Sequence, residues 1–236
     1  MRIDVVTLFP ELFEPFLRTS LVGRGNERGH VSFRQRSPRD WGHGKHRSVD
    51  DTPYGGGSGM VMRVDCLVSC LESLDEDAPD GIRAHRVLLT PQGSPFCQRQ
   101  AHELAAFPAL ALICGRYEGF DERIRSFVDK EISLGDFVMT GGEVVAMAII
   151  EAVVRLLPGI LGNQDSLKDE SHGLSHGGLL EYPQYTRPAD YRTIGVPDVL
   201  KNGNHEAIRA WREKQARIRT AERRPDMMTF LRDQTQ

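Results

Sequence analysis

The chain lacks the features of a membrane protein or an exported protein. It contains no run of ~18 consecutive apolar residues, the length that a membrane-spanning helix needs. Its N-terminal segment, MRIDVVTLFP, has one arginine and then an alternating pattern where a signal peptide would have a long apolar stretch. These absences predict a cytoplasmic protein without a membrane partner.

The chain also has little net charge and few cysteines. A formal net charge of −3 and a pI near 6.2 give no general attraction to nucleic acid, so any basic surface must be local. The four cysteines contain no C-x-x-C pair, and Cys66 and Cys70 share one face of a predicted helix. All four, including Cys97 and Cys114, are interpreted as buried thiols rather than as disulfides or zinc ligands.

Motifs for metals and for nucleotide phosphates are missing. His43, His172 and His176 have no spacing typical of zinc ligands, so no metal site is predicted. Neither G-x-G-x-x-G nor G-x-x-x-x-G-K-[ST] occurs, and the Gly-Gly-Gly-Ser-Gly run at 55–59 is not followed by lysine. These absences argue against a dinucleotide or a triphosphate as the ligand.

What the chain does contain is an alternation of short apolar runs with helical patterns. With 236 residues, 39% of them hydrophobic, it can bury one ordinary core and a smaller appendage. Helical spacing marks residues 12–21 and 144–157, and Ser94-Pro95 fits the start of another helix. The predicted strands cover residues 2–8, 31–35, 86–89, 109–114 and 131–134. This alternation predicts an α/β fold with a mainly parallel sheet and helices on both faces.

Composition divides the chain into three parts. Residues 1–160 form the α/β domain, residues 161–178 are a polar interdomain linker, and residues 179–236 form a helical domain. Asn204 is a good N-cap for a helix that reaches Arg223. The cations on and beside this helix are Arg209, Arg212, Lys214, Arg217, Arg219, Arg223 and Arg224. They predict a local surface for phosphate contacts, with a solvated helix face as the alternative.

Three glycine-bearing loops each follow a predicted strand, at residues 90–94, 115–119 and 134–142. If these strands are neighbours, the loops meet at one edge of the sheet, where α/β proteins bind ligands. Gly141 and Gly142 would permit φ > 0 and let a flat polar ligand approach the backbone, or would only serve a tight turn. Because Arg116 is the only cation in the loops, the predicted ligand is adenosine-like and has no phosphate tail.

Four segments, in order along the chain, resemble the bacterial tRNA (guanine-N1)-methyltransferases of the SPOUT superfamily. They are PYGGGSGM at 53–60, CGRYEGFDER at 114–123, SLGDFVMTGGE at 133–143 and YTRP at 185–188. The resemblance extends over essentially the whole chain and implies a trefoil-knotted α/β domain that holds S-adenosylmethionine in the knot. It also implies a flexible linker, a small helical C-terminal domain and an obligate homodimer whose active sites lie between protomers.

In that family, backbone groups of the glycine loops hold the adenine, the ribose and the methionyl group of the cofactor. The resemblance assigns this role to Pro91, Gly93, Gly115, Tyr117, Glu118, Gly119, Leu134, Gly135, Phe137, Met139, Gly141 and Gly142. Glu118 is expected to pair with the ribose hydroxyls. Because the stretch from Phe137 to Met139 looks like a strand, these two side chains have a second interpretation as core residues.

The family methylates N1 of guanosine 37, next to the tRNA anticodon, which maintains the reading frame in translation. N1 carries a proton at neutral pH, so the reaction requires a general base. The family uses a linker aspartate that precedes a serine; the matching residue here is Glu170, and the adjacent Asp169 is the alternative. Arg155, which lies in an otherwise apolar helix, matches the family's cation for the charge that develops beside O6 of guanine.

Three residues match the family's contacts with the anticodon stem-loop of tRNA. His46, Asp50 and Gly59 lie in a long polar segment at 41–59, and Asp50 is expected to read the edge of the preceding guanine. The family also implies a need for Mg²⁺ in turnover, although the sequence shows no site for it.

Two other functions stay open at this point. Related knotted enzymes share these cofactor loops, so the substrate could be another tRNA position or ribosomal RNA. A non-catalytic RNA-binding module could instead use the basic helix and keep the nucleoside pocket as a regulatory site. Asp169, Glu170 and Arg155 argue against the second of these functions.

Overall fold

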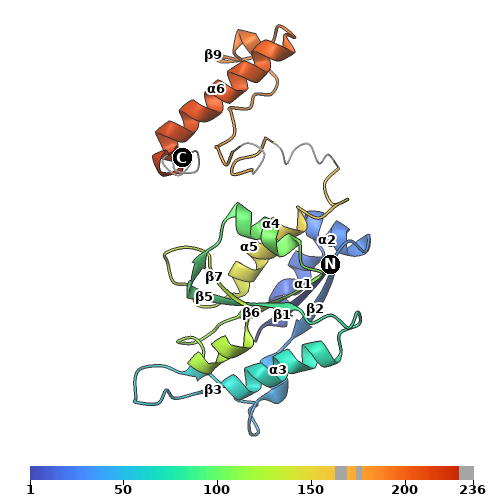
Figure 1. Ribbon diagram of the computed structural model, residues 1–236, viewed down its shortest axis with the longest axis vertical. Coiled ribbons are helices and arrows are strands. Elements are labelled where there is room, and N and C mark those ends of the chain that lie inside the picture. Colours follow the sequence, from blue (N-terminus) through green and yellow to red (C-terminus); the bar gives the residue numbers. More distant parts are fainter. Residues whose placement is uncertain (163–168, 174–176, 229–236) are drawn as a thin grey trace. The chain divides into compact units, whose positions relative to one another are not determined.

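The computed structural model describes residues 1–162, 169–173 and 177–228 (Figure 1). The chain divides into two compact units, Met1–Gly162 and Asn163–Gln236, and each is described by itself. Two stretches of the predicted linker, 163–168 and 174–176, lie outside the described residues, and His176 lies there with them. Among the described residues, no helix is long and apolar enough to cross a membrane.

A five-stranded parallel sheet forms the centre of the first unit. Its order is β2 (Ser32–Arg36), β1 (Arg2–Val6), β6 (Ala109–Cys114), β5 (His85–Pro95) and β7 (Lys130–Ser133). In register, Arg2 of β1 lies opposite Ser32 of β2 and Ala109 of β6. Every residue of β6, ALALIC, is buried, as expected for a central parallel strand covered on both faces. The predicted parallel α/β sheet is confirmed.

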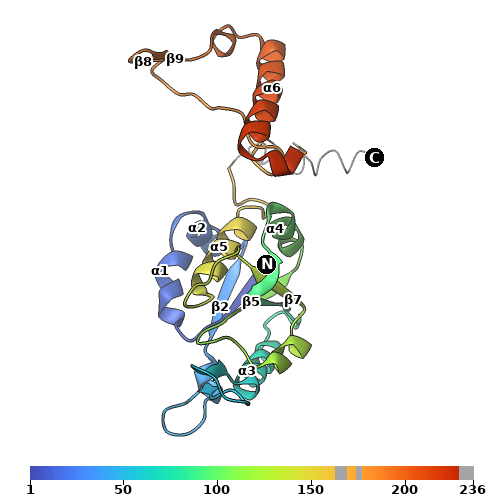
Figure 2. The ribbon, with the colours of Figure 1, turned by 90° about the vertical axis from the view of Figure 1, so that its left-hand side faces the viewer.

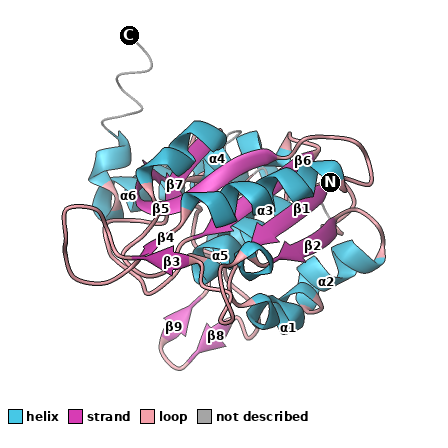
Figure 3. Cartoon of the chain, turned by 90° about the horizontal axis from the view of Figure 1, so that it is seen from below, coloured by secondary structure: helices cyan, strands magenta, loops and turns pink. Residues whose placement is uncertain are grey.

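Helices cover both faces of this sheet (Figures 1 and 2). One face carries α1 (Phe13–Leu17), α2 (Ser20–Glu27), α4 (Gln98–Ala105) and α5 (Glu143–Val154). The other face carries α3 (Val64–Glu76) and the 3₁₀ helix η3 (Glu122–Phe127), and this face is nearer the viewer in Figure 3. Between β2 and α3 the chain forms a short antiparallel ribbon of β3 (Asp50–Asp51) and β4 (Val61–Met62). Two 3₁₀ turns, η1 (Pro10–Leu12) and η2 (Pro38–Trp41), follow β1 and β2.

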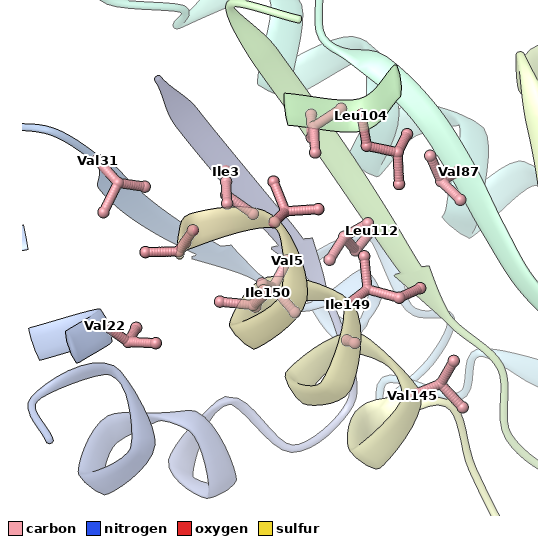
Figure 4. Close-up of a cluster of buried hydrophobic side chains, with 14 of the residues drawn as sticks. Ile3, Val5, Val22, Val31, Val87, Leu104, Leu112, Val145, Ile149 and Ile150 are labelled. Atoms are coloured by element: carbon pink, nitrogen blue, oxygen red, sulfur yellow. The ribbon is translucent and has the colours of Figure 1, made fainter. Parts of the chain in front are cut away.

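The core follows the alternation of side chains along the strands. Val5 of β1 and Leu112 of β6 pack in one cluster with Ile149 of α5 (Figure 4). The next residue along each strand, Val6 and Ile113, packs in a second cluster with the side chains of α3. Two apolar clusters on opposite faces of one sheet therefore make up the core, as the predicted layers require.

β5 is longer than its apolar run predicts. Residues 90–94, expected to form a loop, continue the strand, and the pairing with β7 shifts register between Leu89 and Ser94. Gly93 lies so close to the backbone of Ile132 that a Cβ atom at this position would overlap it. A side chain here would therefore separate β5 from β7.

The predicted helix start at Ser94-Pro95 is wrong. Both residues belong to β5, and α4 begins after its N-cap residue, Cys97. The Phe96 amide donates to the Ser133 carbonyl (2.8 Å), which continues the pairing with β7 beyond the end of β5. Pairing with a neighbouring strand outweighs the local Ser-Pro signal, because strand formation depends strongly on tertiary context.

The stretch from Phe137 to Met139 is not a strand. β7 ends at Ser133, whose hydroxyl donates to the Gly135 carbonyl (3.0 Å) and accepts from the Gly135 amide (3.2 Å). After this turn, Phe137 and Val138 are 54% and 84% exposed, whereas Met139 packs against the core. The interpretation as core residues is therefore wrong for Phe137 and correct for Met139.

The main element of the second unit is the helix α6 (His205–Arg223). The Asn204 side chain accepts a hydrogen bond from the Ala207 amide (3.1 Å), so the predicted N-cap is confirmed, as is the predicted end at Arg223. A hairpin of β8 (Asp190–Tyr191) and β9 (Ile194–Gly195) and the turn η6 (Asp198–Leu200) precede the helix.

Replacement of Ile149 tests the packing of α5 on the sheet. Ile149→Ala removes a fully buried side chain and is expected to lower the free energy of unfolding by about 2–5 kcal/mol. Val138→Ala, at an exposed position, is the control and should change that free energy by less than about 0.5 kcal/mol. Chemical denaturation followed by circular dichroism measures both, and equal effects would contradict the packing described.

Candidate functional site

A cavity of about 270 Å³ opens at the carboxyl ends of β5, β6 and β7. Its walls come from residues 88–92 of β5 and from the segments that follow β6 and β7, together with η3 and the first turn of α5. Parallel α/β proteins bind their ligands at this edge of the sheet. The predicted meeting of the three glycine-bearing segments at one edge is confirmed.

Most of the residues predicted to bind the cofactor line this cavity. Its walls include Pro91, Gly115, Tyr117, Glu118, Gly119, Leu134, Phe137, Met139, Gly141 and Gly142. Gly93 and Gly135 lie outside the walls. Gly93 packs against the backbone of β7, and Gly135 forms the turn that ends β7, so both shape the strands that carry the site.

Residues 116–119 form a tight turn at the mouth of β6. The Gly119 amide donates to the Arg116 carbonyl (3.2 Å), and Tyr117, the first inner residue, has a φ of 59°. A positive φ at this position is typical of a type II′ turn, which suits glycine and costs another residue ~1–2 kcal/mol. Tyr117 and Glu118 are both exposed on this turn. Strained residues of this kind concentrate at ligand-binding sites.

A buried ion pair connects this turn to the start of α5. Glu143 is 1% exposed; its carboxylate lies 2.9 Å from the Arg116 guanidinium and accepts a hydrogen bond from the Thr7 hydroxyl (2.9 Å). Arg116 also lies over the Phe9 ring, 4.5 Å from its centroid, and donates to the Thr140 carbonyl (3.3 Å). The contact of Arg116 with Glu143 is ionic rather than an aligned hydrogen bond. It holds together the ends of β1 and β6 and the loop before α5.

Gly141 and Gly142 are required by close packing. Neither has a positive φ, so this pair does not use the left-handed backbone that glycine permits. A Cβ atom on Gly141 would overlap the buried ion pair, and one on Gly142 would lie 2.9 Å from the Cα of Cys114. The Gly142 amide donates to the Gly115 carbonyl (2.9 Å). The two glycines therefore let two walls of the cavity come into direct backbone contact.

The segment between β2 and α3 packs against the same turn from another side. The Glu118 amide donates to the Met60 carbonyl (3.0 Å), and the Met62 amide donates to the Gly119 carbonyl (2.9 Å). Gly59 has a φ of 83°, and a Cβ atom there would lie 2.5 Å from the Glu118 side chain. The structure thus places a predicted substrate residue, Gly59, directly beside a predicted cofactor residue.

The other two predicted substrate residues lie farther from the cavity along this segment. His46 is exposed in a turn whose ends, His43 and Ser48, pair through their backbones. Asp50 is half-buried in β3, opposite Met62 of β4. Neither His46 nor Asp50 lines the cavity.

The three predicted catalytic residues are not among the walls of the cavity. Arg155 is half-buried at the C-cap of α5, whereas Glu143, next to the cavity, begins that helix. At a rise of ~1.5 Å per residue, the two positions are about 18 Å apart along the helix. Asp169 and Glu170 belong to the second compact unit.

Thiols and carboxylates near the cavity have well-defined charges. Burial raises the pKa of the Cys114 thiol well above its usual value, and the nearby Glu143 carboxylate raises it further, so this thiol stays neutral. Hydrogen bonding to Arg123 lowers the pKa of Asp121, which lines the cavity as a carboxylate. The prediction of four buried thiols is wrong for Cys97, which is exposed.

One group of possible metal ligands occurs among the described residues, His43 with Asp65 and Cys66, whose ligand atoms lie within 4.8 Å of one another. Arg63 donates to both oxygens of the Asp65 carboxylate (3.1 and 2.8 Å), and the Cys66 thiol donates to the Trp41 carbonyl (3.3 Å). These contacts already satisfy the carboxylate and the thiol. We therefore assign no metal to this group.

The cations of α6 serve two different purposes. Arg212 lies over the Tyr182 ring, 4.6 Å from its centroid, and Arg219 donates to the Glu181 carbonyl (3.3 Å), so both contribute to packing within the unit. Arg224, at the C-cap, pairs with an aspartate. The exposed cations of the helix are Arg209, Lys214, Arg217 and Arg223. The local basic surface is therefore smaller than the sequence predicts.

Sequence reasoning missed the role of Glu143. Its partner Thr7 lies 136 residues away, so no local pattern connects the two. The available signal was an acid at the start of a mostly apolar helix, EVVAMAIIEAVV, directly after two glycines. Arg116, the only cation in the three loops, was the complementary signal.

The fold and the cavity define a class of protein. A parallel α/β sheet with a cavity walled by glycine loops at its carboxyl edge, and without a phosphate-binding motif, is typical of proteins that bind a nucleoside-type cofactor. A family model described as "tRNA (Guanine-1)-methyltransferase TrmD" matches residues 1–230. The chain belongs to this family, which confirms the resemblance found in four segments of the sequence.

Curated relatives are similar over almost the whole chain, and each is named tRNA (guanine-N(1)-)-methyltransferase. The protein of Sorangium cellulosum is 64% identical, with 96% of this chain and 93% of the relative aligned. The protein of Syntrophotalea carbinolica is 51% identical over 97% of this chain and 90% of its own. The protein of Halalkalibacterium halodurans is 50% identical over 97% of this chain and 91% of its own.

Neutralising Glu143 tests the buried ion pair. Glu143→Gln leaves Arg116 without its charged partner and is expected to lower the free energy of unfolding by about 1–3 kcal/mol. The loss is smaller than for a fully buried pair because Arg116 is partly exposed to solvent. Glu151→Gln, at an exposed position of the same helix, is the matched control. Urea denaturation measures both, and an unchanged midpoint for Glu143→Gln would refute the role assigned to the pair.

Proposed function

We propose that this protein transfers a methyl group from S-adenosylmethionine to N1 of guanosine 37 in tRNA, in the cytoplasm, and so maintains the reading frame in translation. The observation that carries the proposal is the cavity walled by the three glycine-bearing segments, in a chain 64% identical to a relative named for this activity. The alignment covers both chains almost completely, which supports transfer of the whole activity.

The residues of the cavity fit S-adenosylmethionine, which supplies an activated methyl group on a sulfonium when bound. Arg116 is engaged by Glu143, so this cation is not available to a phosphate. Carboxylates line the cavity at Glu118, Asp121 and Glu122. Asp121 and Glu122 pair with Arg123 and Arg125, and the exposed carboxylate of Glu118 suits the positive charge of a sulfonium. In this proposal the backbone of Gly115, Gly119, Leu134, Gly141 and Gly142 holds the adenine and the methionyl group, and Glu118 binds the ribose. Tyr117, Pro91, Phe137 and Met139 complete the walls.

The same proposal includes the trefoil knot that the family implies. It is supported by the tight approach of the segment 134–142 to the end of β6, through the Gly142 amide and the Gly115 carbonyl. Gly141 and Gly142 allow this approach because neither carries a side chain. Gly93 and Gly135 would act by shaping β5 and the exit of β7.

Removal of the N1 proton requires a base, and we assign this step to a carboxylate at 169–170, with Glu170 as the residue that matches the family. As the proton leaves, negative charge develops beside O6 of guanine, and the guanidinium of Arg155 would stabilise it. Arg155 lies about 18 Å along α5 from Glu143, the residue that begins this helix beside the cavity of its own chain. This separation favours a homodimer in which the Arg155 of one protomer serves the cavity of the other.

We further propose that the two units share the binding of tRNA. The exposed cations of α6, Arg209, Lys214, Arg217 and Arg223, would contact phosphates of the anticodon stem. His46, Asp50 and Gly59 would contact the anticodon loop, with Gly59 beside Glu118. The division into a domain at 1–160, a linker at 161–178 and a tRNA-binding domain at 179–236 belongs to this proposal.

For Mg²⁺, no group of three close carboxylates is found among the described residues, so no step is assigned to it.

Methyl transfer to a defined transcript tests the proposed function. A tRNA transcript with guanosine at 37 is incubated with labelled S-adenosylmethionine, beside the same transcript with adenosine there. Mass spectrometry of the digested nucleosides should find N1-methylguanosine in the first and no label in the second. A label at another guanosine would identify a different RNA site, and binding of both cofactor and RNA without transfer would favour a non-catalytic module.

Gly141→Ala tests the proposed cofactor site. The added methyl overlaps the Arg116–Glu143 pair, and overpacking of this kind costs about 1–3 kcal/mol. Because Gly141 lines the cavity, the wall must move to make room for the methyl group. The affinity for S-adenosylmethionine should therefore fall about tenfold. Gly162→Ala, which meets no atom within 4 Å, is the matched control and should leave the affinity unchanged. Isothermal titration calorimetry measures both, and equal affinities for the two variants would count against the assigned site.

A further inference from the structure

A long exposed stretch of the second unit has no role in the function proposed above. Every residue from 184 to 195 is exposed, and the stretch contains both the YTRP segment at 185–188 and the hairpin of β8 and β9. A short two-stranded hairpin is only marginally stable in water when nothing packs on it. This hairpin therefore stands to gain from contact with a partner.

Three neighbouring side chains form the end of the hairpin. Tyr191 and Ile194 lie directly opposite each other in the strand register, so their side chains share one face. They are 60% and 71% exposed. The Arg192 guanidinium lies over the Tyr191 ring, 5.4 Å from its centroid. These three side chains, the hairpin tip, combine an aromatic ring, an aliphatic chain and a cation on one exposed surface.

The backbone of the hairpin tip is unfavourable for the residue that occupies it. Arg192 and Thr193 form a two-residue loop, and Arg192 alone of the two has a positive φ, 57°. This pattern is typical of a type II′ turn, in which glycine is preferred at the first position. An arginine here costs free energy, and strained residues of this kind concentrate at functional sites. The side chain of Arg192 thus has a use that offsets the strain.

The charge of Arg192 is available to a ligand. Other cations of the unit are paired, since Lys201 lies 2.8 Å from the Asp198 carboxylate and Arg224 lies 2.7 Å from that of Asp226. In the part of the chain that the structure describes, no carboxylate pairs with Arg192. A guanidinium that lies over a ring keeps N–H groups at its edge, which suit the oxygens of a phosphate.

The size of the hairpin tip favours a nucleotide over a protein as the partner. A stable protein interface buries about 1,200–2,000 Å², far more than two neighbouring apolar side chains supply. An unpaired nucleotide needs much less, because one aromatic ring takes up its base and one cation binds its phosphate. The aromatic ring and the cation of the hairpin tip match these two parts.

We infer that the hairpin tip binds an unpaired nucleotide of the tRNA. Its base packs against Tyr191 and Ile194, and Arg192 holds the phosphate beside it. The inference rests on the proposed function for the identity of the RNA. It adds a contact with a base to the contacts proposed between α6 and phosphates of the stem.

Substitutions at two positions separate the contact with the base from the contact with the phosphate. Tyr191→Leu removes the ring and keeps an apolar side chain, whereas Tyr191→Phe keeps the ring. Arg192→Gln removes the charge. Arg224→Gln is the matched control, because this arginine of the same unit is already paired. Fluorescence anisotropy measures the affinity of each full-length variant for the labelled tRNA transcript with guanosine at 37, between about 50 and 300 mM KCl.

Tyr191→Leu should weaken binding by about 5- to 150-fold at every salt concentration, the range expected when one stacked base is lost. Tyr191→Phe should bind within about twofold of the unmodified protein. Arg192→Gln should weaken binding about fivefold near 0.1 M salt and reduce the slope of log K against log salt by about 0.7–0.9, as expected for one phosphate contact. Arg224→Gln should change neither the affinity nor the slope.

Arg192→Gly separates binding from folding. Glycine suits the backbone of this turn, so the midpoint of thermal unfolding should be unchanged or higher than in the unmodified protein. Its affinity for the transcript should nevertheless fall as in Arg192→Gln. A lower midpoint would contradict the strain assigned to Arg192.

Three results would overturn the inference. The first is unchanged affinity in Tyr191→Leu, and the second is an unchanged salt slope in Arg192→Gln. The third is a change in the sedimentation of the free protein in Tyr191→Leu without loss of affinity for RNA, which would make the tip a contact between copies of the chain. Failure of the proposed function is a separate result: the unmodified protein would bind the transcript without forming N1-methylguanosine, and the binding data would still decide the role of the tip.

Discussion

The buried ion pair of Arg116 and Glu143 is the interaction on which the cavity depends. A carboxylate that is almost fully buried is stable only with partners, and Glu143 finds them in Arg116 and in the hydroxyl of Thr7. These three residues come from the end of β6, the start of α5 and the end of β1. Their charge and hydrogen-bonding requirements therefore bring three distant segments together. Gly141 makes the arrangement possible, because any side chain there would occupy the space of the pair.

This pair also determines which ligands suit the cavity. Arg116 is the only cation in the three glycine-bearing segments, and Glu143 neutralises it inside the protein. Of the other charged groups along the walls, Asp121 pairs with Arg123 and Arg125 pairs with Glu122, whereas the carboxylate of Glu118 is exposed. A cavity of this kind favours a cationic nucleoside over a phosphate ester. The fold thus supplies the geometry for a nucleoside, and one internal ion pair sets the preference for charge.

The second unit shows a comparable division of labour around α6. Some of its cations are consumed by packing: Arg212 covers Tyr182, and Arg219 binds a backbone carbonyl. This packing fastens residues 179–182 to the helix, while Arg209 and Arg217 stay exposed. A helix that appears in the sequence as a uniform basic surface therefore has two faces with different tasks. One face packs against residues 179–182, and the other faces solvent.

The sequence by itself determined the parallel α/β fold, the N-cap at Asn204 and the family, because each leaves a local pattern of apolar residues, caps or motifs. It also predicted the meeting of the glycine-bearing segments at one sheet edge, since parallel strands end together. Only the tertiary structure decided that Ser94-Pro95 continues β5, that Phe137 is exposed and that Glu143 is the partner of Arg116. These outcomes depend on contacts between residues far apart in the chain, and such contacts leave no periodicity or spacing in the local sequence.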